Sequence, residues 1–243
     1  MIPKTIHYCW FGRKPLPPLA EKCIASWKKY LPDYEIIEWN EDNFDINGIP
    51  YTKEAYQAGK YAFVSDYARF WILYHYGGLY FDTDVEVIKS IDDIISKGPF
   101  MGREILQHES GDDINPGLGI GAAPEMEIFK EVLNVYKTKR FYNNDSTLNL
   151  TTVVTVTTKI LSTHEKHQLD NNVIQIGGIN IYPTEYFCPK NYYTGEMMIT
   201  SNTVAIHHYD ASWKSNKDKL KRKIINILGE RLTRIIVKFK HLI

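Results

Sequence analysis

Residues 61–87, YAFVSDYARFWILYHYGGLYFDTDVEV, place charged side chains in a segment that is otherwise apolar and aromatic. In residues 62–76 the apolar side chains surround almost the whole helical wheel, which predicts a helix that is packed on most sides. The two glycines that follow predict its end. Residues 79–87 then alternate with a period of two, which predicts a single strand with Asp82 and Asp84 on one face.

Two explanations fit the pair of carboxylates at Asp82 and Asp84. They can lie on the solvated face of an edge strand, or they can hold a cation, since adjacent carboxylates repel each other unless a positive charge lies between them. Hard divalent cations prefer oxygen ligands, and a metal that holds a diphosphate is a common use of such a pair. Asp66 and Arg69, three residues apart on the helix, indicate by themselves a partly buried ion pair.

The spacing of these residues resembles the DXD sugar-binding region of family 32 glycosyltransferases, which includes fungal mannosyltransferases and bacterial capsule and lipopolysaccharide enzymes. The residues that carry the resemblance are Ser65-Asp66, Arg69, Gly77-Gly78, Tyr80 and Asp82-Thr83-Asp84. The resemblance implies an α/β fold, a GT-A type Rossmann-like domain, that transfers sugar with retention of configuration. It also implies Mn²⁺ or Mg²⁺ on Asp82 and Asp84, donor-sugar hydroxyls on Asp66 and Arg69, and Tyr80 beside them.

Two further segments contain candidate donor-binding residues. The opening IPKTIHYCWFG predicts a strand that runs into an aromatic turn, and open α/β sheets bind ligands at such strand ends. Trp10 and Phe11 are therefore either core aromatics or, as the resemblance implies, part of the nucleotide pocket, with Trp10 stacked on the base. Asn115 matches a family asparagine near the donor sugar, although an Asn-Pro turn explains it equally well.

Residues 202–214, NTVAIHHYDASWK, predict an apolar strand that ends in two histidines. Because side chains alternate along a strand, only one of His207 and His208 can face the site, and a half-buried structural histidine is the alternative. The resemblance of this segment to the closing motif of the family implies that His207 or His208 completes the metal shell with Asp84 or donates to a phosphate oxygen, and we favour His208. It further implies that Ser212 and Trp213 contact the diphosphate.

The remaining secondary structure is predicted from hydrophobic periodicity and from Gly and Pro positions. Residues 150–161, LTTVVTVTTKIL, stay open between strand and helix, because β-branched residues favour a strand whereas the family has a helix near this point. The other predicted elements are a helix at 17–30, a connecting helix within 88–100, a strand at 100–105, a Gly-rich strand after 115 and a helix at 125–140.

Composition predicts a single α/β catalytic domain in residues 1–213, since 243 residues are enough to bury one core. The first ten residues read as a strand and predict neither a signal peptide nor a membrane anchor. Three cysteines without metal-ligand spacing favour a reducing cytoplasm. The formal net charge is zero, and no nucleic-acid partner is expected.

The basic residues are concentrated in the tail, residues 214–243. This tail contains ten Lys and Arg against two acidic residues, and since the whole chain has 29 of each sign, residues 1–213 have a net charge of −8. Apolar residues recur at helical spacing in the tail, which predicts a basic amphipathic helix on an anionic membrane surface. A helix docked on the domain is the alternative. The predicted location is the inner face of the cell membrane, peripheral and cytoplasmic.

The resemblance thus implies a metal-dependent hexosyltransferase that acts on a nucleotide diphosphate sugar, with a UDP-sugar favoured by analogy with bacterial and toxin relatives and GDP-mannose as the other candidate. It further implies a glycan or a lipid-linked oligosaccharide acceptor in capsular polysaccharide or lipopolysaccharide synthesis. Two other functions use the same features: a nucleotide-sugar hydrolase with water as acceptor, and a non-catalytic membrane-associated scaffold.

Overall fold

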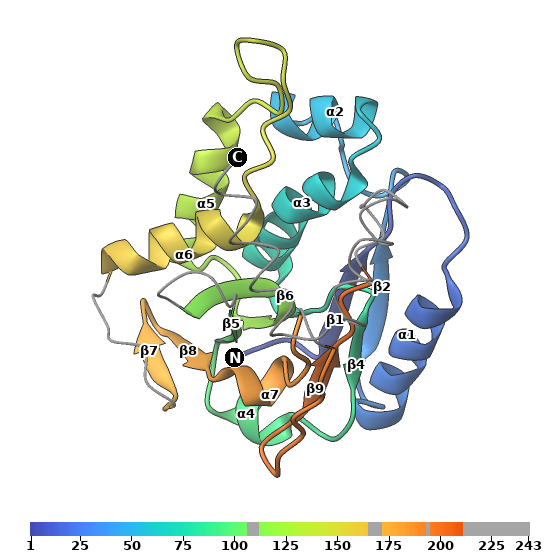
Figure 1. The fold of residues 1–243 in the computed structure, drawn as a ribbon, viewed down its shortest axis with the longest axis vertical. Helices are drawn as coiled ribbons and strands as arrows, with labels where there is room; N and C mark the ends of the chain where they lie inside the picture. Colours follow the sequence, from blue (N-terminus) through green and yellow to red (C-terminus); the bar gives the residue numbers. More distant parts are fainter. Residues whose placement is uncertain (106–111, 165–171, 193–194, 211–243) are drawn as a thin grey trace, which may run out of the picture.

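The computed structural model describes residues 1–105, 112–164, 172–192 and 195–210, and the strands of these residues form a seven-stranded mixed sheet in the order β2-β1-β3-β6-β5-β8-β7 (Figure 1). β1 is parallel to β2 and β3, β6 is antiparallel to β3 and β5, and β5 is parallel to β8. The strands are β1 (Thr5–Cys9), β2 (Glu35–Trp39), β3 (Gly78–Tyr80), β5 (Phe100–Ile105), β6 (Asp112–Ala122), β7 (Ile174–Ile176) and β8 (Ile179–Tyr182).

Helices cover both faces of this sheet and bury two apolar clusters (Figure 1). One cluster contains residues of α2, α3, α5 and α6, and the other contains residues of α1, α4 and α7. The helices are α1 (Pro18–Tyr30), α2 (Pro50–Gln57), α3 (Tyr61–Tyr76), α4 (Asp92–Ser96), α5 (Glu127–Thr138), α6 (Val153–His164) and α7 (Thr184–Phe187). The arrangement confirms the predicted α/β class.

The central helix α3 is buried on most sides, as its sequence predicts. Its end depends on glycine, because Gly77 and Gly78 have φ values of 65° and 97°, which other residues rarely adopt. A Cβ on Gly78 would also lie 2.7 Å from the carbonyl oxygen of Thr5. The adjacent His7 is a structural residue, since it accepts the indole N–H of Trp39 and contacts the carbonyl oxygen of Gly77, both at 3.1 Å.

The prediction of one continuous strand over residues 79–87 is wrong. The chain forms β3, leaves the sheet in a turn at Asp82–Asp84, and then forms β4 (Val85–Val87), which pairs with β9 (Ala205–His207) in a separate two-stranded sheet. Hydrogen bonds from Asp82 N–H to the Gly117 carbonyl at 3.2 Å and from Val85 N–H to the Asp82 carbonyl at 3.0 Å hold the turn. Burial follows the predicted alternation in β4, whereas all three residues of β3 are buried. The alternation in the sequence continues through the break, so it contains no signal for the turn.

Two other expectations are settled by the packing. Residues 153–164 form α6, which buries Val153, Val156 and Leu161, so the segment left open between strand and helix is a helix. The connecting segment 88–100 contains only the short α4, although Ile91 and Ile94 are buried as expected. The strand at 100–105 is present with the predicted bounds, and the helices at 17–30 and 125–140 are present with slightly shorter bounds.

The predicted boundary at residue 213 and the basic tail lie outside the described residues. None of the helices in the described part of the chain combines the length and the apolar composition that crossing a membrane requires.

Candidate active site

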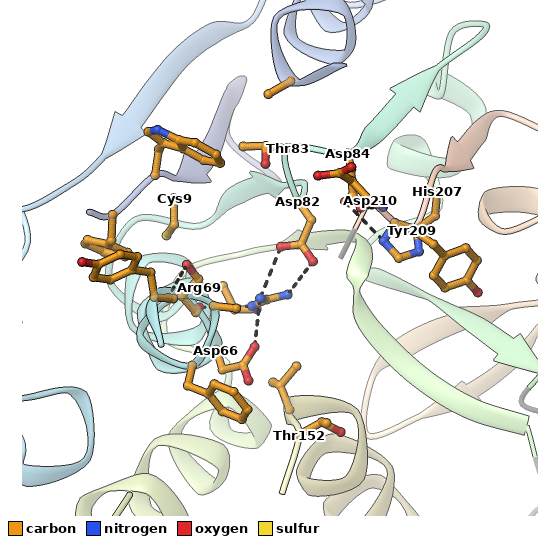
Figure 2. A pocket seen from close by; sticks show the side chains of 18 of the residues that line it. Cys9, Asp66, Arg69, Asp82, Thr83, Asp84, Thr152, His207, Tyr209 and Asp210 are labelled. Atoms are coloured by element: carbon orange, nitrogen blue, oxygen red, sulfur yellow. Dashed lines mark hydrogen bonds and ion pairs between the residues drawn. The ribbon is translucent and has the colours of Figure 1, made fainter. Parts of the chain in front are cut away.

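A cavity of about 480 Å³ opens where the end of β1, the start of α3 and the Asp82–Asp84 turn meet. The opposite side of this cavity is formed by β6, the first residues of α6 and the segment that follows β9. Figure 2 shows Asp82 between Arg69 on one side and Asp84 with His207 on the other. The break between β3 and β4 therefore brings the acidic turn to a place where three separate parts of the chain converge.

Arg69 is the centre of one wall of the cavity and is only 3% exposed. Its guanidinium donates to Asp66 Oδ1 at 3.0 Å and lies 3.3 Å from Asp82 Oδ1, while its Nε donates to the Ser65 carbonyl at 3.1 Å (Figure 2). The Tyr80 hydroxyl donates to Asp82 at 3.1 Å, and its ring lies 4.8 Å from the Arg69 guanidinium carbon. One buried cation thus orients two carboxylates, which an ion pair between helix neighbours alone does not explain.

The electrostatics of this wall follow from burial. Burial raises the pKa of Asp66 to about 6, although Arg69 opposes the shift. For Arg69 burial favours the neutral form, but Asp82, Tyr80 and Asp66 outweigh it and hold its pKa above the usual range. Both carboxylates face the cavity, so they can accept hydrogen bonds from the hydroxyl groups of a bound sugar.

Asp84 belongs to the other wall and pairs with His207. The distance from His207 Nε2 to Asp84 Oδ1 is 3.3 Å, and the backbone N–H of Asp210 donates to Asp84 Oδ2 at 2.9 Å. Burial opposes ionisation of Asp84, but the charge and hydrogen bond of His207 and the N–H of Asp210 lower the pKa of this carboxyl to about 2. Asp84 in turn raises the pKa of His207 well above its usual value against the effect of burial.

The choice of His208 as the metal-shell histidine is wrong. His207 is the residue beside Asp84, whereas His208 Nε2 lies 2.8 Å from Glu86 Oε2 on the other side of the strand. Strand alternation requires that the two histidines face opposite sides, and the register Val85 to His207 in the β4–β9 pair decides which one faces the cavity. That register depends on tertiary pairing, which the His-His sequence does not specify.

Asp82, Asp84 and His207 fit a divalent cation. Each offers one ligand atom, and these atoms all lie within 4.8 Å of one another. Carboxylate oxygens with one imidazole nitrogen suit manganese, and the carboxylates suit magnesium. These three residues would hold the ion at the floor of the cavity.

The predicted donor-binding residues in the described part of the chain all reach this cavity or its wall. Trp10, Phe11 and Asn115 line it, and Tyr80 supports Asp82 from behind. Phe11 is also a core residue, 5% exposed, with its ring centroid 5.8 Å from that of Phe44, so it packs in the core and borders the cavity. Ser212 and Trp213 lie outside the described residues.

The Asn115 side chain makes a hydrogen bond within its own strand, β6. Its side-chain oxygen accepts the backbone N–H of Gly117 at 2.7 Å, which is the turn reading of this residue, and the side chain is nevertheless at the cavity wall. The close approach of Asp82 explains Gly117, because a Cβ on this glycine would lie 2.2 Å from Asp82 Oδ2. The Gly-rich strand β6 therefore provides room for the acidic turn.

Several lining residues had no assigned role in the sequence. Glu104 and Tyr209 are 5% and 9% exposed, and Thr152 and Val153 place the start of α6 at the cavity. Glu104 had one detectable signal, an acidic side chain within a strand of mainly apolar residues. The start of α6 had none, since the segment itself was ambiguous between helix and strand.

Comparison with known proteins assigns this region to a family. Residues 17–101 match the model of the glycosyltransferase sugar-binding region containing the DXD motif. This part of the chain is thus similar to a DXD glycosyltransferase sugar-binding region. This match confirms the resemblance that the sequence indicated, and it covers α3, the acidic turn and the residues around Arg69.

Curated relatives of this DXD region include fungal and viral proteins. The chain is 31% identical over 101 residues to inositol phosphoceramide mannosyltransferase 3 of Schizosaccharomyces pombe, covering 39% of this chain and 27% of the relative. It is 27% identical over 198 residues to an uncharacterized glycosyltransferase of Acanthamoeba polyphaga mimivirus, covering 79% and 77%. The chain thus spans about a quarter of the length of the fission-yeast relative.

Solved structures show the same fold at low identity. PaToxG glycosyltransferase superposes with a TM-score of 0.52 at 20% identity, covering 67% of this chain and 69% of that chain. A glycosyltransferase involved in the glycosylation of the major capsid of PBCV-1 superposes with a TM-score of 0.52 at 13% identity, covering 90% and 98%. The DXD region therefore lies in a GT-A type fold.

Proposed function

We propose that the protein is a metal-dependent glycosyltransferase that moves a hexosyl unit from a nucleotide diphosphate sugar to a glycan acceptor. One observation carries the proposal: the cation-binding set Asp82, Asp84 and His207 shares a cavity with the buried Asp66–Arg69 pair. A diphosphate and a sugar are adjacent in such a donor, and the cavity has a cation site and a hydroxyl-binding wall side by side.

The side chains of the two walls have distinct tasks in this proposal. A cation bound by Asp82, Asp84 and His207 neutralises the charge that develops on the departing diphosphate. Arg69 keeps Asp82 oriented through a contact that does not depend on the cation. Asp66 accepts donor hydroxyl groups, and the buried position of this pair excludes water from the sugar.

The identities of the hexose and of the nucleotide in the donor also belong to the proposal. Bacterial and toxin enzymes of the resembling family favour a UDP-sugar, whereas the names of the fission-yeast relatives refer to mannosyl transfer. Those relatives align over about 100 residues, a length close to that of the sugar-binding region. GDP-mannose therefore enters the test beside the UDP-hexoses.

The test is a thermal-shift screen of UDP- and GDP-sugars, with and without Mn²⁺, on the wild type, Asp84→Asn and Asp93→Asn. We expect a Mn²⁺-dependent rise in the melting temperature with one nucleotide class, lost in Asp84→Asn and kept in Asp93→Asn, whose side chain is exposed on α4. Product analysis with and without a glycan acceptor then separates transfer from hydrolysis. A donor shift that survives in Asp84→Asn contradicts the cation assignment.

We further propose that the tail, residues 214–243, holds the enzyme on the cytoplasmic face of an anionic membrane, close to a lipid-linked or growing surface glycan. The support is the concentration of ten Lys and Arg among apolar residues in this segment. Removal of residues 214–243 should abolish co-sedimentation with vesicles that contain phosphatidylserine, and should leave binding to neutral vesicles at its low starting level. Equal co-sedimentation of the two proteins would contradict this role.

A further inference from the structure

A second set of potential ligand atoms lies beside His207. Glu104, on β5, and Cys188, which follows α7, each place a ligand atom within 4.8 Å of the other and of a His207 nitrogen. The Tyr209 hydroxyl lies 2.8 Å from Cys188 Sγ and donates to Glu104 Oε2 at 3.0 Å. These side chains come from three distant parts of the sequence and converge on one point.

The donor atoms of this second set differ in kind from those of the acidic turn. Sulfur, imidazole nitrogen and one carboxylate oxygen are the ligands that Zn²⁺ takes in proteins, at about 2.3 Å from sulfur and 2.0–2.2 Å from nitrogen and oxygen. Thiolate favours soft or borderline cations, whereas Mn²⁺ and Mg²⁺ favour the oxygen-rich set of Asp82 and Asp84. The two sets therefore select different metals.

An independent feature of His207 points to a ligand. The residue is only 8% exposed, and its Nδ1 is buried and has no hydrogen-bond partner within the described part of the chain. Buried polar atoms are nearly always satisfied, and an unsatisfied one indicates a missing partner. Glu104, His207 and Tyr209 line the cavity, so an ion that enters it can reach the set. His207 and Tyr209 lie side by side in Figure 2.

We propose that Glu104, Cys188 and His207 form a zinc site next to the Asp82–Asp84 cation site. As the Zn–S bond forms, the Cys188 thiol releases its proton to solvent. The Tyr209 hydroxyl is placed to occupy the fourth ligand position or to hydrogen-bond to the ligand that occupies it. His207 belongs to both sets: its Nε2 lies 3.3 Å from Asp84, and its Nδ1 is the atom left for zinc. Zinc binding at this site does not depend on the proposed glycosyl transfer.

The experiment uses Co²⁺ as a spectroscopic probe for Zn²⁺ on the full chain in saturating Mg²⁺. The wild type should show the thiolate-to-cobalt charge-transfer band, and added Zn²⁺ should remove it. Cys188→Ser should lose the band and bind Zn²⁺ at least about tenfold more weakly. Cys23→Ser is the matched control, since Cys23 is an equally buried free thiol in α1, and it should keep both properties. A wild type without the band, or a band that persists in Cys188→Ser, overturns the site.

Two further variants keep the test decisive. Asp84→Asn should keep the cobalt band, because Asp84 is not a ligand of this site; loss of the band there would place the ion at the acidic turn and overturn the proposal. Glu104→Gln should keep the band but weaken Zn²⁺ binding, and it carries the test if Cys188→Ser fails to fold. Unchanged Zn²⁺ affinity in Glu104→Gln would remove Glu104 from the site. If no sugar transfer is found, the cobalt band still decides the metal site.

Discussion

The two walls of the cavity neutralise the negative charge of their carboxylates with different partners. On the α3 wall, Asp66 and Asp82 share the buried guanidinium of Arg69, which is charged at any pH the protein encounters. On the β4–β9 wall, the Asp84 carboxylate pairs with His207 and accepts the backbone N–H of Asp210. Histidine changes charge near neutral pH and can also bind a metal as the neutral ring.

This difference indicates separate roles. The α3 wall is preorganised by its own charge, so its geometry should be the same with or without a cation. The β4–β9 wall depends on a partner whose charge state can change, so it is the part of the site that should respond to metal and pH.

The largest effect is expected for Arg69→Met. This variant leaves Asp66 and Asp82 without their buried counter-charge, and breaking a buried ion pair in this way costs about 3–5 kcal/mol of folding free energy. Urea unfolding measures the loss. The control is Arg13→Met, because Arg13 pairs with Asp42 on the surface and should contribute little. If both variants unfold at the same urea concentration as the wild type, the α3 wall is not preorganised by Arg69.

A second effect is expected at the junction of the walls. In Gly117→Ala the new Cβ would overlap Asp82 Oδ2, so Asp82 must move away from Arg69 or from the cation. A displacement of about 1 Å in a reacting group can lower the rate about 100-fold. Transfer rates at saturating Mn²⁺ measure this loss. Gly48→Ala, where the nearest atom lies 3.3 Å away and outside the site, should keep its rate.

The pH response belongs to the β4–β9 wall in the metal-free protein. The lowered pKa of Asp84 contributes stability above its unfolded value of 3.8, and this contribution is lost as the pH falls toward about 2. The raised pKa of His207 contributes stability that is complete below 6.5 and is lost as the pH rises further. His207→Gln should therefore have a free energy of unfolding roughly 2 kcal/mol lower than that of the wild type, mainly between about pH 3.8 and about pH 6.5.

Urea unfolding in the presence of a chelator, from about pH 3 to about pH 9, measures how this stability difference changes with pH. His164→Gln is the control, because His164 pairs with Glu131 at a far more exposed site. A constant difference between wild type and His207→Gln over the whole pH range would show that the pair does not act as described.

The smallest effect is expected for His208→Gln. His208 contacts Glu86 on the face turned away from the cavity, so transfer activity should stay within about twofold of wild type, as for a partly exposed ion pair. His207→Gln assayed under the same conditions should lose most of its activity. Equal loss in both variants would show that the strand register does not separate the two histidines.

Much of the site was predictable because its residues are local in sequence. Asp66 and Arg69 are one helical turn apart, so short-range geometry was sufficient to pair them. The DXD spacing was sufficient to bring Asp82 and Asp84 to one site, although they lie in a turn and not on one face of a strand. The same holds for the end of α3, where two successive glycines leave few alternatives. The contact between Arg69 and Asp82 was not predictable in this way, because it joins a helix to a turn after a change of direction.

By itself, the sequence determined the α/β class, the buried helix α3, its glycine end and the identity of the carboxylates, since propensity and periodicity act over a few residues. Tertiary structure decided that residues 79–87 split between two sheets, that His207 faces Asp84, and that Glu104 and Cys188 lie beside it. The physical reason is pairing over long separations: β4 meets β9 about 120 residues later, and one step of that register reverses every side chain.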